Sequence, residues 1–417
     1  VTVPDSTLSP SDGYLPNGLR VVVQPEKASD TVTVIGAVRH EDAVQTAPGK
    51  DGVEDVLEGL FSYGTTSLDR LAYQKALDDI AAQESAGPTF TLHVLKPNFD
   101  RGVQLLADNE LHPALPGAAF AIVQKQTAQT LAGQEQSPDY ITRRTTDQAL
   151  YPAGDPQLRE ATPATVTALG LDDVQKQFAA VYRPDMTTIV VIGNVTPSEA
   201  RATIAKYFGG WTAAGAKPSI DLPKVALNKA AAAVVPNATR VQDQTSLVES
   251  VDVTRTDKDF YALELGDHVL GGGFYATRLY HDLRQVAGLV YNVSNRLTAG
   301  RVRSTYTISY GCDPPNVSKA RKLAERDLRA MQTVDVTPAE LQQAKAILLR
   351  QLPLAEGSED AVATALATDA NDGLPLDEPY RAATIYAHLT ATQVRAAFAK
   401  HIRPAAFVQV VQGPNPS

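Results

Sequence analysis

Residues 187–193 read Thr-Thr-Ile-Val-Val-Ile-Gly, and residues 405–412, near the other end of the chain, read Ala-Ala-Phe-Val-Gln-Val-Val-Gln. Both runs are short and apolar, and Val and Ile are frequent in them, which is typical of buried β-strands. The stretches that precede the two runs show the same pattern of predicted elements, in which strands alternate with helices. The sequence therefore predicts an α+β fold of two similar halves, each a mixed or antiparallel sheet packed with helices.

The segment between the halves contains Gly, Ala and Pro and predicts a linker. We expect an N-terminal half over 1–215, a linker over 216–227 and a C-terminal half over 228–417. The apolar periodicity predicts further elements. In the first half these are strands at 31–38 and 89–95 and helices at 53–63, 68–83, 98–109, 117–134 and 171–182. In the second half they are strands at 245–253, 289–297 and 304–310 and helices at 257–270, 275–287, 316–331 and 338–352.

The composition excludes several classes of protein. The 417 residues include 38 Lys and Arg against 47 Asp and Glu, a net charge of −9. Nucleic-acid binding is disfavoured because no basic stripe could replace the counterions around phosphates. No run of 18 apolar residues predicts a membrane-spanning helix, and the single cysteine, Cys312, excludes a disulfide framework. The scarcity of Cys and a first residue other than Met favour a processed, periplasmic protein, and a cytoplasmic or mitochondrial location is the alternative, since few Cys are also common in cytosolic proteins.

Residues 48–65 contain the most specific motif, Pro-Gly-Lys-Asp-Gly-Val-Glu-Asp-Val-Leu-Glu-Gly-Leu-Phe-Ser-Tyr-Gly-Thr. This stretch resembles the signature of the pitrilysin/insulinase family of zinc peptidases, in which His-x-x-Glu-His is followed by Leu-Phe-x-x-Gly-Thr. Weaker matches extend the resemblance over nearly the whole chain, at 15–19, 178–185 and 189–195. The resemblance implies a metalloprotease fold similar to that of the mitochondrial processing peptidase.

The zinc motif itself is degenerate. In the family, two His on one helical face hold zinc and the intervening Glu activates water. The corresponding positions here are Asp55, Glu58 and Gly59, so both imidazole ligands are missing. The third ligand, a Glu in the family, would fall near Thr130, and the stretch 123–134 contains no carboxylate. We therefore expect no metal and no other cofactor in this chain.

A plainer interpretation of the acidic residues is that Glu54, Asp55 and Glu58 are solvated and favoured by the helix dipole. No two of the seven His are four residues apart, so no other helical zinc site is visible. His40 is expected at the surface rather than as a ligand.

A second stretch, residues 269–291, resembles the other signature of the family. Position by position, it implies that Arg284 and Tyr291 are the Arg/Tyr pair that hydrogen-bonds the bound peptide and the developing oxyanion. Both side chains are hydrogen-bond donors, and Gly288 allows a helix to end so that Tyr291 begins a strand. The alternative is that Arg284 caps a helix and Tyr291 fills a strand. The run 271–273 of three Gly predicts close backbone approach rather than a phosphate-binding loop.

The resemblance to the family, together with the missing histidines of the zinc motif, predicts that this chain is the zinc-lacking subunit of a heterodimeric metallopeptidase and is inactive alone. A homologous, zinc-bearing partner would supply the metal, and oligopeptides or unfolded proteins would be the substrates, docked by strand addition to a sheet edge. The alternative is a non-catalytic structural or chaperone-like core subunit. A self-sufficient hydrolase has no recognisable nucleophile motif, since Cys312 has no His nearby in the sequence.

Overall fold

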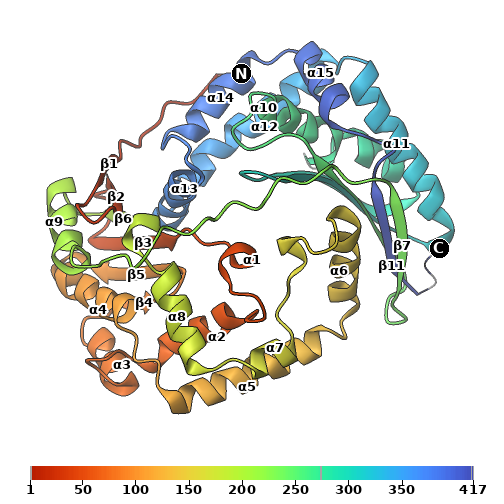
Figure 1. Ribbon diagram of the computed structural model, residues 1–417. Helices are drawn as coiled ribbons and strands as arrows, with labels where there is room; N and C mark the ends of the chain where they lie inside the picture. Colours follow the sequence, from red (N-terminus) through yellow and green to blue (C-terminus); the bar gives the residue numbers. More distant parts are fainter. Residues whose placement is uncertain (1, 273–274, 415, 417) are drawn as a thin grey trace.

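The computed structural model describes residues 2–272, 275–414 and 416, and the strands in these residues form two sheets (Figure 1). The first sheet contains, in spatial order, β1 (Ser11–Tyr14), β2 (Arg20–Pro25), β6 (Thr187–Gly193), β3 (Thr31–Val38), β5 (Thr89–Leu95) and β4 (Gln83–Ser85). The second contains β7 (Ala231–Pro236), β11 (Val408–Gly413), β8 (Asp243–Val251), β10 (Ser304–Cys312) and β9 (Val290–Ala299).

Apart from β1, the two sheets share one topology. In the first sheet β6 lies between β2, which is parallel to it, and β3, which is antiparallel. In the second sheet β11 lies between β7, which is parallel, and β8, which is antiparallel. The edge strands β4 and β9 also correspond. The prediction of an α+β fold with two similar halves is confirmed, and the two apolar runs occupy the same place in each.

Helices surround both sheets. Those of the first half are α1 (Asp42–Gln45), α2 (Val53–Leu60), α3 (Arg70–Asp78), α4 (Phe99–Leu111), α5 (Gly117–Gln134), α6 (Pro138–Leu150), α7 (Pro163–Thr167), α8 (Leu171–Val181) and α9 (Pro197–Phe208). The helix α5 has the bounds that the periodicity predicts. At the start of α9, Thr196 and Glu199 form a capping box, which satisfies the free N–H groups of the first turn.

The second half contains α10 (Phe260–Asp267), α11 (Val317–Thr333), α12 (Pro338–Ala355), α13 (Glu359–Asp372), α14 (Glu378–His388) and α15 (Ala391–His401). Two of its predicted helices differ from the structure. The expected helix 257–270 is α-helical only over α10 and continues as a π-helical turn, His268–Gly272. The expected helix 275–287 is a π-helical turn over Tyr280–Val286. None of the helices described is both long and apolar enough to cross a bilayer.

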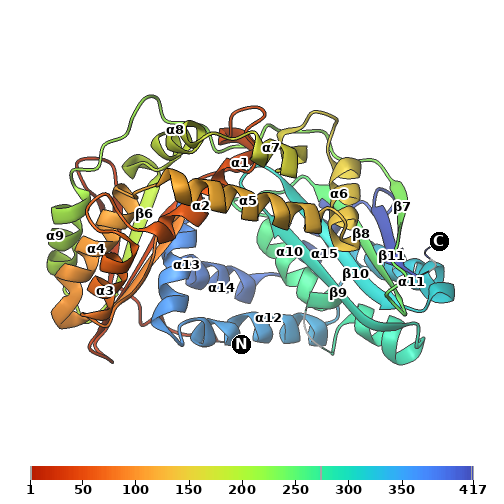
Figure 2. The ribbon, with the colours of Figure 1, turned by 90° about the horizontal axis from the view of Figure 1, so that it is seen from below.

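The two halves exchange one helix each. The second-half helix α13 lies on β3 and β6 of the first sheet, where Val362 and Leu366 pack against Ile35 and Val190 (Figures 1 and 2). The first-half helix α6 lies on β7 and β11 of the second sheet, and its residue Leu150 belongs to the apolar cluster there (Figure 1). Each sheet is therefore completed by an element from the other half of the sequence.

The connection between the halves is irregular, and polar contacts fix it in place. Residues 211–230 form no helix or strand. Arg183 donates to the carbonyl oxygens of Ala214 and Ala216. From the turn between β9 and β10, Arg303 donates to the carbonyl of Pro223 and forms a buried ion pair with Asp155 at 2.8 Å. The connection therefore follows a defined path along both halves.

Candidate functional site

The degenerate motif lies on α2, directly after a tight turn. Gly52 has a φ of +92°, and a Cβ there would lie 2.5 Å from Val166, so the approach of the chain requires glycine. The apolar residues of α2 face the core: Val53, Val56, Leu57 and Leu60 are buried. Asp55 and Glu58, at the first His and the Glu positions of the motif, are exposed on the other face.

Gly59, at the second His position, is where α5 packs on α2. A Cβ at Gly59 would lie 2.6 Å from Cγ1 of Val123, closer than real contacts allow. A histidine at this position would therefore have to displace Val123. Val123 therefore occupies the space that the side chain of the second zinc ligand would need.

The remaining residues do not fit a zinc ion either. Thr130, near the expected third ligand, is an exposed residue of α5. Across the residues that the structure describes, no group of three His, Cys, Asp or Glu side chains is placed to hold a metal ion. The chain therefore presents neither the ligands nor the space that the family's zinc requires.

Glu54 corrects the interpretation of the three acids as solvated. Its side chain is only 3% exposed, and it accepts hydrogen bonds from the hydroxyl of Tyr182 (2.8 Å) and the amide of Gln177 (3.2 Å). Burial raises the pKa of Glu54 to about 6. Glu54 precedes the motif by one residue and turns into the core, because that face of α2 meets α8.

One fully buried carboxyl, Glu110, and one half-buried carboxyl, Glu84, accompany Glu54. Glu110 is fully buried, and the N–H of Gly87 donates to it (2.9 Å); burial raises its pKa well above the usual range. Glu84, on β4, accepts a bond from Asn109 at 3.1 Å, and burial raises its pKa to about 7. Sequence analysis missed this cluster, because an acidic residue on a strand or helix gives no sign that it faces inward.

The exposed acids of the motif form an electronegative surface. Burial by the surrounding protein raises the pKa of Asp55, with a smaller contribution from Asp42, although solvent reaches the side chain. The pKa of Glu58 is also raised by burial and then by Asp55, whereas His40 lowers it. His40 is exposed, as expected.

A cavity of about 590 Å³ lies between the motif and the edge strand β4. Its lining includes Glu58, Leu71, Glu84 and Asn109. Leu71 is 81% exposed. Because β4 pairs only with β5, its outer side is open to another strand.

Arg284 and Tyr291 meet on the second sheet. Tyr291 lies on β9 and is half exposed, and Gly288, with a φ of +62°, lies in the turn before that strand. The guanidinium of Arg284 donates to the backbone carbonyl of Tyr291, and the Tyr291 hydroxyl donates to Asp313 (3.2 Å). The two side chains are adjacent and solvent-accessible, and each is bound within the chain.

The glycine run before these residues shows one close approach. A Cβ at Gly271 would lie 2.3 Å from the side-chain oxygen of Asn295, so the backbone contacts β9 closely, as expected. Gly272 ends the π-helical turn. Gly273 lies outside the described residues.

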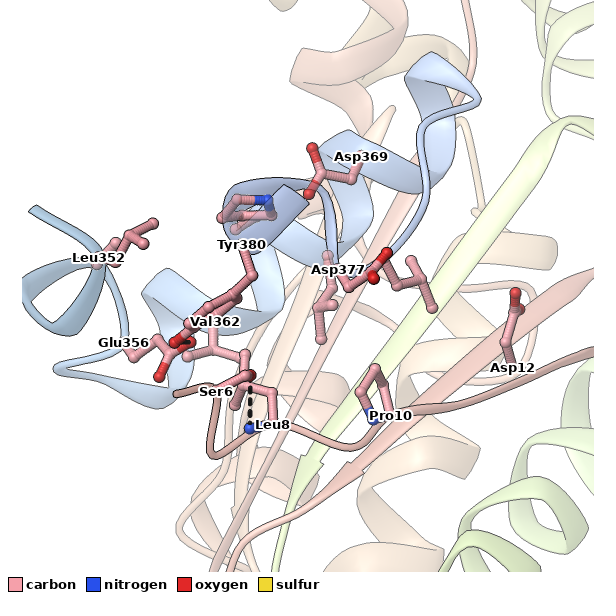
Figure 3. A pocket seen from close by; sticks show the side chains of 15 residues that line it. Ser6, Leu8, Pro10, Asp12, Leu352, Glu356, Val362, Asp369, Asp377 and Tyr380 are labelled. Atoms are coloured by element: carbon pink, nitrogen blue, oxygen red, sulfur yellow. Dashed lines mark hydrogen bonds between the residues drawn. The ribbon is translucent and has the colours of Figure 1, made fainter. Parts of the chain in front are cut away.

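A second cavity, of about 380 Å³, lies under the N-terminal segment (Figure 3). Leu8 and Pro10 lie on one side of it and Val362, on α13, on the other. Its polar lining residues include Asp369 and Asp377, and none of its described lining residues is basic. Burial raises the pKa of Asp369 to about 7. This cavity is apolar with an acidic rim.

Comparison with known proteins agrees with this geometry. The sequence profile of the Peptidase M16 inactive domain matches residues 168–348. Among curated proteins, the chain is similar to the uncharacterized zinc protease YmxG of Bacillus subtilis, with 23% identity over 342 residues, 79% of this chain and 80% of that protein.

Two solved structures share the fold. A peptidase M16 inactive domain from Pseudomonas fluorescens superposes with a TM-score of 0.85 at 20% identity, covering 98% of this chain and 99% of that one. The periplasmic protease PqqL from Escherichia coli superposes with a TM-score of 0.83 at 16% identity, covering 99% of this chain but 47% of that one. The whole chain therefore corresponds to about half of PqqL.

Proposed function

We propose that the chain is a member of the M16 peptidase family, the pitrilysin/insulinase group, and that it is the zinc-lacking subunit of a heterodimeric zinc endopeptidase. A homologous partner would hold the zinc and its general base. This chain would contribute Arg284, Tyr291 and half of the wall around the substrate. The main support for the proposal is that Val123 lies where a side chain at residue 59 would be, which leaves no space there for a zinc ligand.

The pairing with a second chain of the same fold is supported by the size of PqqL. One chain of that protease contains about twice the length that this chain matches. A second chain with the zinc motif intact would complete an assembly of similar extent. PqqL is also described as periplasmic, and we propose the same compartment for this chain.

Two features support peptide binding. The edge strands β4 and β9 each have one unpaired side, to which an extended peptide can add by main-chain hydrogen bonds. On β9, Tyr291 is half exposed and lies beside Arg284. Such donors are worth about 3–4 kcal/mol each when they stabilise a developing oxyanion. In this role Tyr291 would exchange its bond to Asp313 for one to the substrate.

The alternative is a structural or chaperone-like core subunit, with no part in hydrolysis. It is favoured by the existing bonds of the pair, since Arg284 and Tyr291 each already stabilise the turn around β9. The two functions differ in what they require of the side chains: a structural subunit needs the fold, whereas a peptidase subunit needs free donors. We also propose that the functional division of the chain follows the linker at 216–227.

The test is reconstitution with a zinc-bearing homologue. The isolated chain is expected to contain no stoichiometric zinc and to leave an unstructured peptide intact, whereas the pair cleaves it. In the pair, Arg284→Ala and Tyr291→Phe are expected to lower kcat/KM by about 10²-fold or more, with assembly unchanged on a sizing column. Tyr14→Phe, at an exposed tyrosine of β1, is the matched control. Unchanged turnover in both variants would favour the structural subunit, and cleavage by the isolated chain would contradict the proposal.

A further inference from the structure

A third cavity, of about 430 Å³, lies where the two halves meet. One wall comes from the first sheet and the residues that follow β3, and includes Arg39, His40 and Thr91. The opposite wall comes from α13, and includes Thr368 and Asn371. The linker contributes Ile220, and the turn between β9 and β10 contributes Arg301.

Arg39 is a cation without an ion-pair partner among the described residues. None of them accepts a hydrogen bond from its guanidinium, and its Nε is buried and unpaired. Burial lowers the pKa of Arg39 and the nearby charge of Arg301 lowers it further, whereas the more weakly acting charges of Asp221 and Asp372 raise it. Arg301, by contrast, is paired with Asp221 at 3.1 Å. An unpaired, partly buried cation is unfavourable, and such groups usually have a ligand or another function.

The wall opposite Arg39 also contains an unsatisfied polar atom. The side-chain oxygen of Asn371 is buried and has no hydrogen-bond partner among the described residues. Because the two ends of an amide can exchange by rotation, Asn371 can present its NH₂ group to an anion. The Thr368 hydroxyl donates to the carbonyl of Thr364 (2.8 Å) and the Thr91 hydroxyl is bonded to that of Ser85 (3.0 Å), so both oxygens keep a lone pair that can accept from a peptide N–H. The lining also contains one acid, Asp372, at the end of α13, and an apolar part that includes Ile35 and Ala367.

We propose that this cavity is an oxyanion site, and that its occupant is the C-terminal carboxylate of a peptide. The planar guanidinium of Arg39 can bind both oxygens of a carboxylate. The apolar wall suits the last side chain of the peptide, and the threonine hydroxyls suit its backbone. The choice of a peptide over another oxyanion rests on the proposed function. His40 lines the cavity and also lowers the pKa of Glu58, so the site adjoins the degenerate motif.

The cavity under the N-terminal segment differs in its charge, since the described lining of the Arg39 cavity has two arginines, Arg39 and Arg301, beside the single acid Asp372. Its polar rim is acidic, and none of its described lining residues could neutralise a carboxylate (Figure 3). A peptide carboxylate is therefore expected at Arg39 and not there. Because the walls of the site come from the first sheet and from α13, a bound peptide would also link the two halves.

The test is direct binding to the full chain, without partner or metal, by titration calorimetry. The probes are an N-acetylated tetrapeptide with a free carboxylate, the same peptide as its C-terminal amide, and inorganic phosphate. The peptide acid is expected to bind at least about tenfold more tightly than the amide. Arg39→Gln is expected to lower the affinity for the peptide acid by a similar factor. Arg329→Gln, at an exposed arginine of α11, is the matched control and should change neither affinity.

Three outcomes would overturn the inference. They are equal affinity for acid and amide, an affinity for the acid that Arg39→Gln leaves unchanged, and tight binding of phosphate with none of the peptide acid. A second variant guards against misfolding of the first: Asn371→Asp adds a negative charge to the opposite wall and should also weaken the acid. These measurements are independent of catalysis. If the acid binds and the reconstituted pair cleaves nothing, the proposed function fails alone; if the pair cleaves and the acid does not bind, only the carboxylate site fails.

Discussion

Val123 of α5 stands in the space that any side chain at Gly59 of α2 would need, with Cγ1 2.6 Å from the position of a Cβ. The two residues lie far apart in the sequence and belong to the helices that would hold a zinc ion in an active member of the family. The metal site is therefore not simply short of ligands. The packing of α5 on α2 also leaves no space for a side chain at the position of the second histidine.

Restoring the two histidines should not restore the metal. We expect Asp55→His/Gly59→His to bind no stoichiometric zinc by elemental analysis, because the third ligand is absent and an imidazole in place of Gly59 would collide with Val123. The collision should destabilise the chain by about 1–3 kcal/mol in urea unfolding, the usual effect of overpacking. Asp55→His alone is the control and should be nearly neutral, since that side chain is exposed. One equivalent of bound zinc in the double variant would contradict the account.

The buried carboxyls should make the chain less stable as the pH rises. Burial raises the pKa of Glu54 to about 6 and that of Glu84 to about 7, and it raises the pKa of Glu110 well above its usual range. A carboxyl with a raised folded pKa favours folding fully below its unfolded pKa, near 4.5, and this contribution is lost as the pH rises through the folded pKa. The free energy of unfolding should therefore fall between about pH 5 and pH 7, by up to about 1.4 kcal/mol per pH unit for each group.

Glu110→Gln should flatten this pH dependence, because the amide keeps the acceptor for the N–H of Gly87 and cannot ionise. Glu340→Gln provides the contrast. Its pKa is lowered to about 2, chiefly by the hydrogen bond from Arg278, so its contribution is lost only as the pH falls below about 4.5. Urea titrations at about pH 5.5 and about pH 7.5 distinguish the two. An equal slope in wild type and Glu110→Gln would show that Glu110 does not titrate in this range.

The Arg/Tyr pair should matter little for stability. Among the described residues, the Tyr291 hydroxyl is bonded only to Asp313, at 3.2 Å, and Tyr291 is half exposed. Tyr291→Phe in the isolated chain is expected to change the free energy of unfolding by less than about 0.5 kcal/mol, as for most surface substitutions. A thermal melt checks this. A loss of more than about 2 kcal/mol would mean that the pair serves the fold, and any loss of turnover in the assembled enzyme would then have a structural cause.

The exchanged helix α13 should couple the unfolding of the two halves. Leu366 is 2% exposed and packs on the first sheet, so Leu366→Ala should lower the free energy of unfolding by about 2–5 kcal/mol. Trp211, the single tryptophan, lies in the first-half core and reports on it by fluorescence. We expect this substitution in the second half to lower the midpoint of the Trp211 transition. Leu354→Ala, 79% exposed, is the control. An unchanged Trp211 midpoint would show that the first sheet folds without α13.

Most strands and helices whose apolar residues recur with a clear period were predicted from the local sequence. The strand at 31–38 and the helix at 117–134 have the predicted bounds, because their periodicity and end signals agree. The helices α6 and α13, which cross between the halves, were not predicted. Their contacts lie with strands far away in the sequence, and no local pattern records which sheet a helix will cover.

The sequence by itself determined the two α+β halves and the resemblance to the pitrilysin/insulinase family. It also showed that both imidazole ligands of that family's motif are missing, because Asp55 and Gly59 stand at their positions. Only the tertiary structure decided which side chains face inward. Glu54 and Asp55 are neighbours in the same turn, yet Glu54 is buried against Tyr182 and Asp55 reaches solvent. The same holds for Arg39, whose lack of a partner is visible only once α13 has folded over the first sheet. Burial and pairing depend on contacts between distant segments, and these follow from the packing of the whole chain rather than from its local sequence.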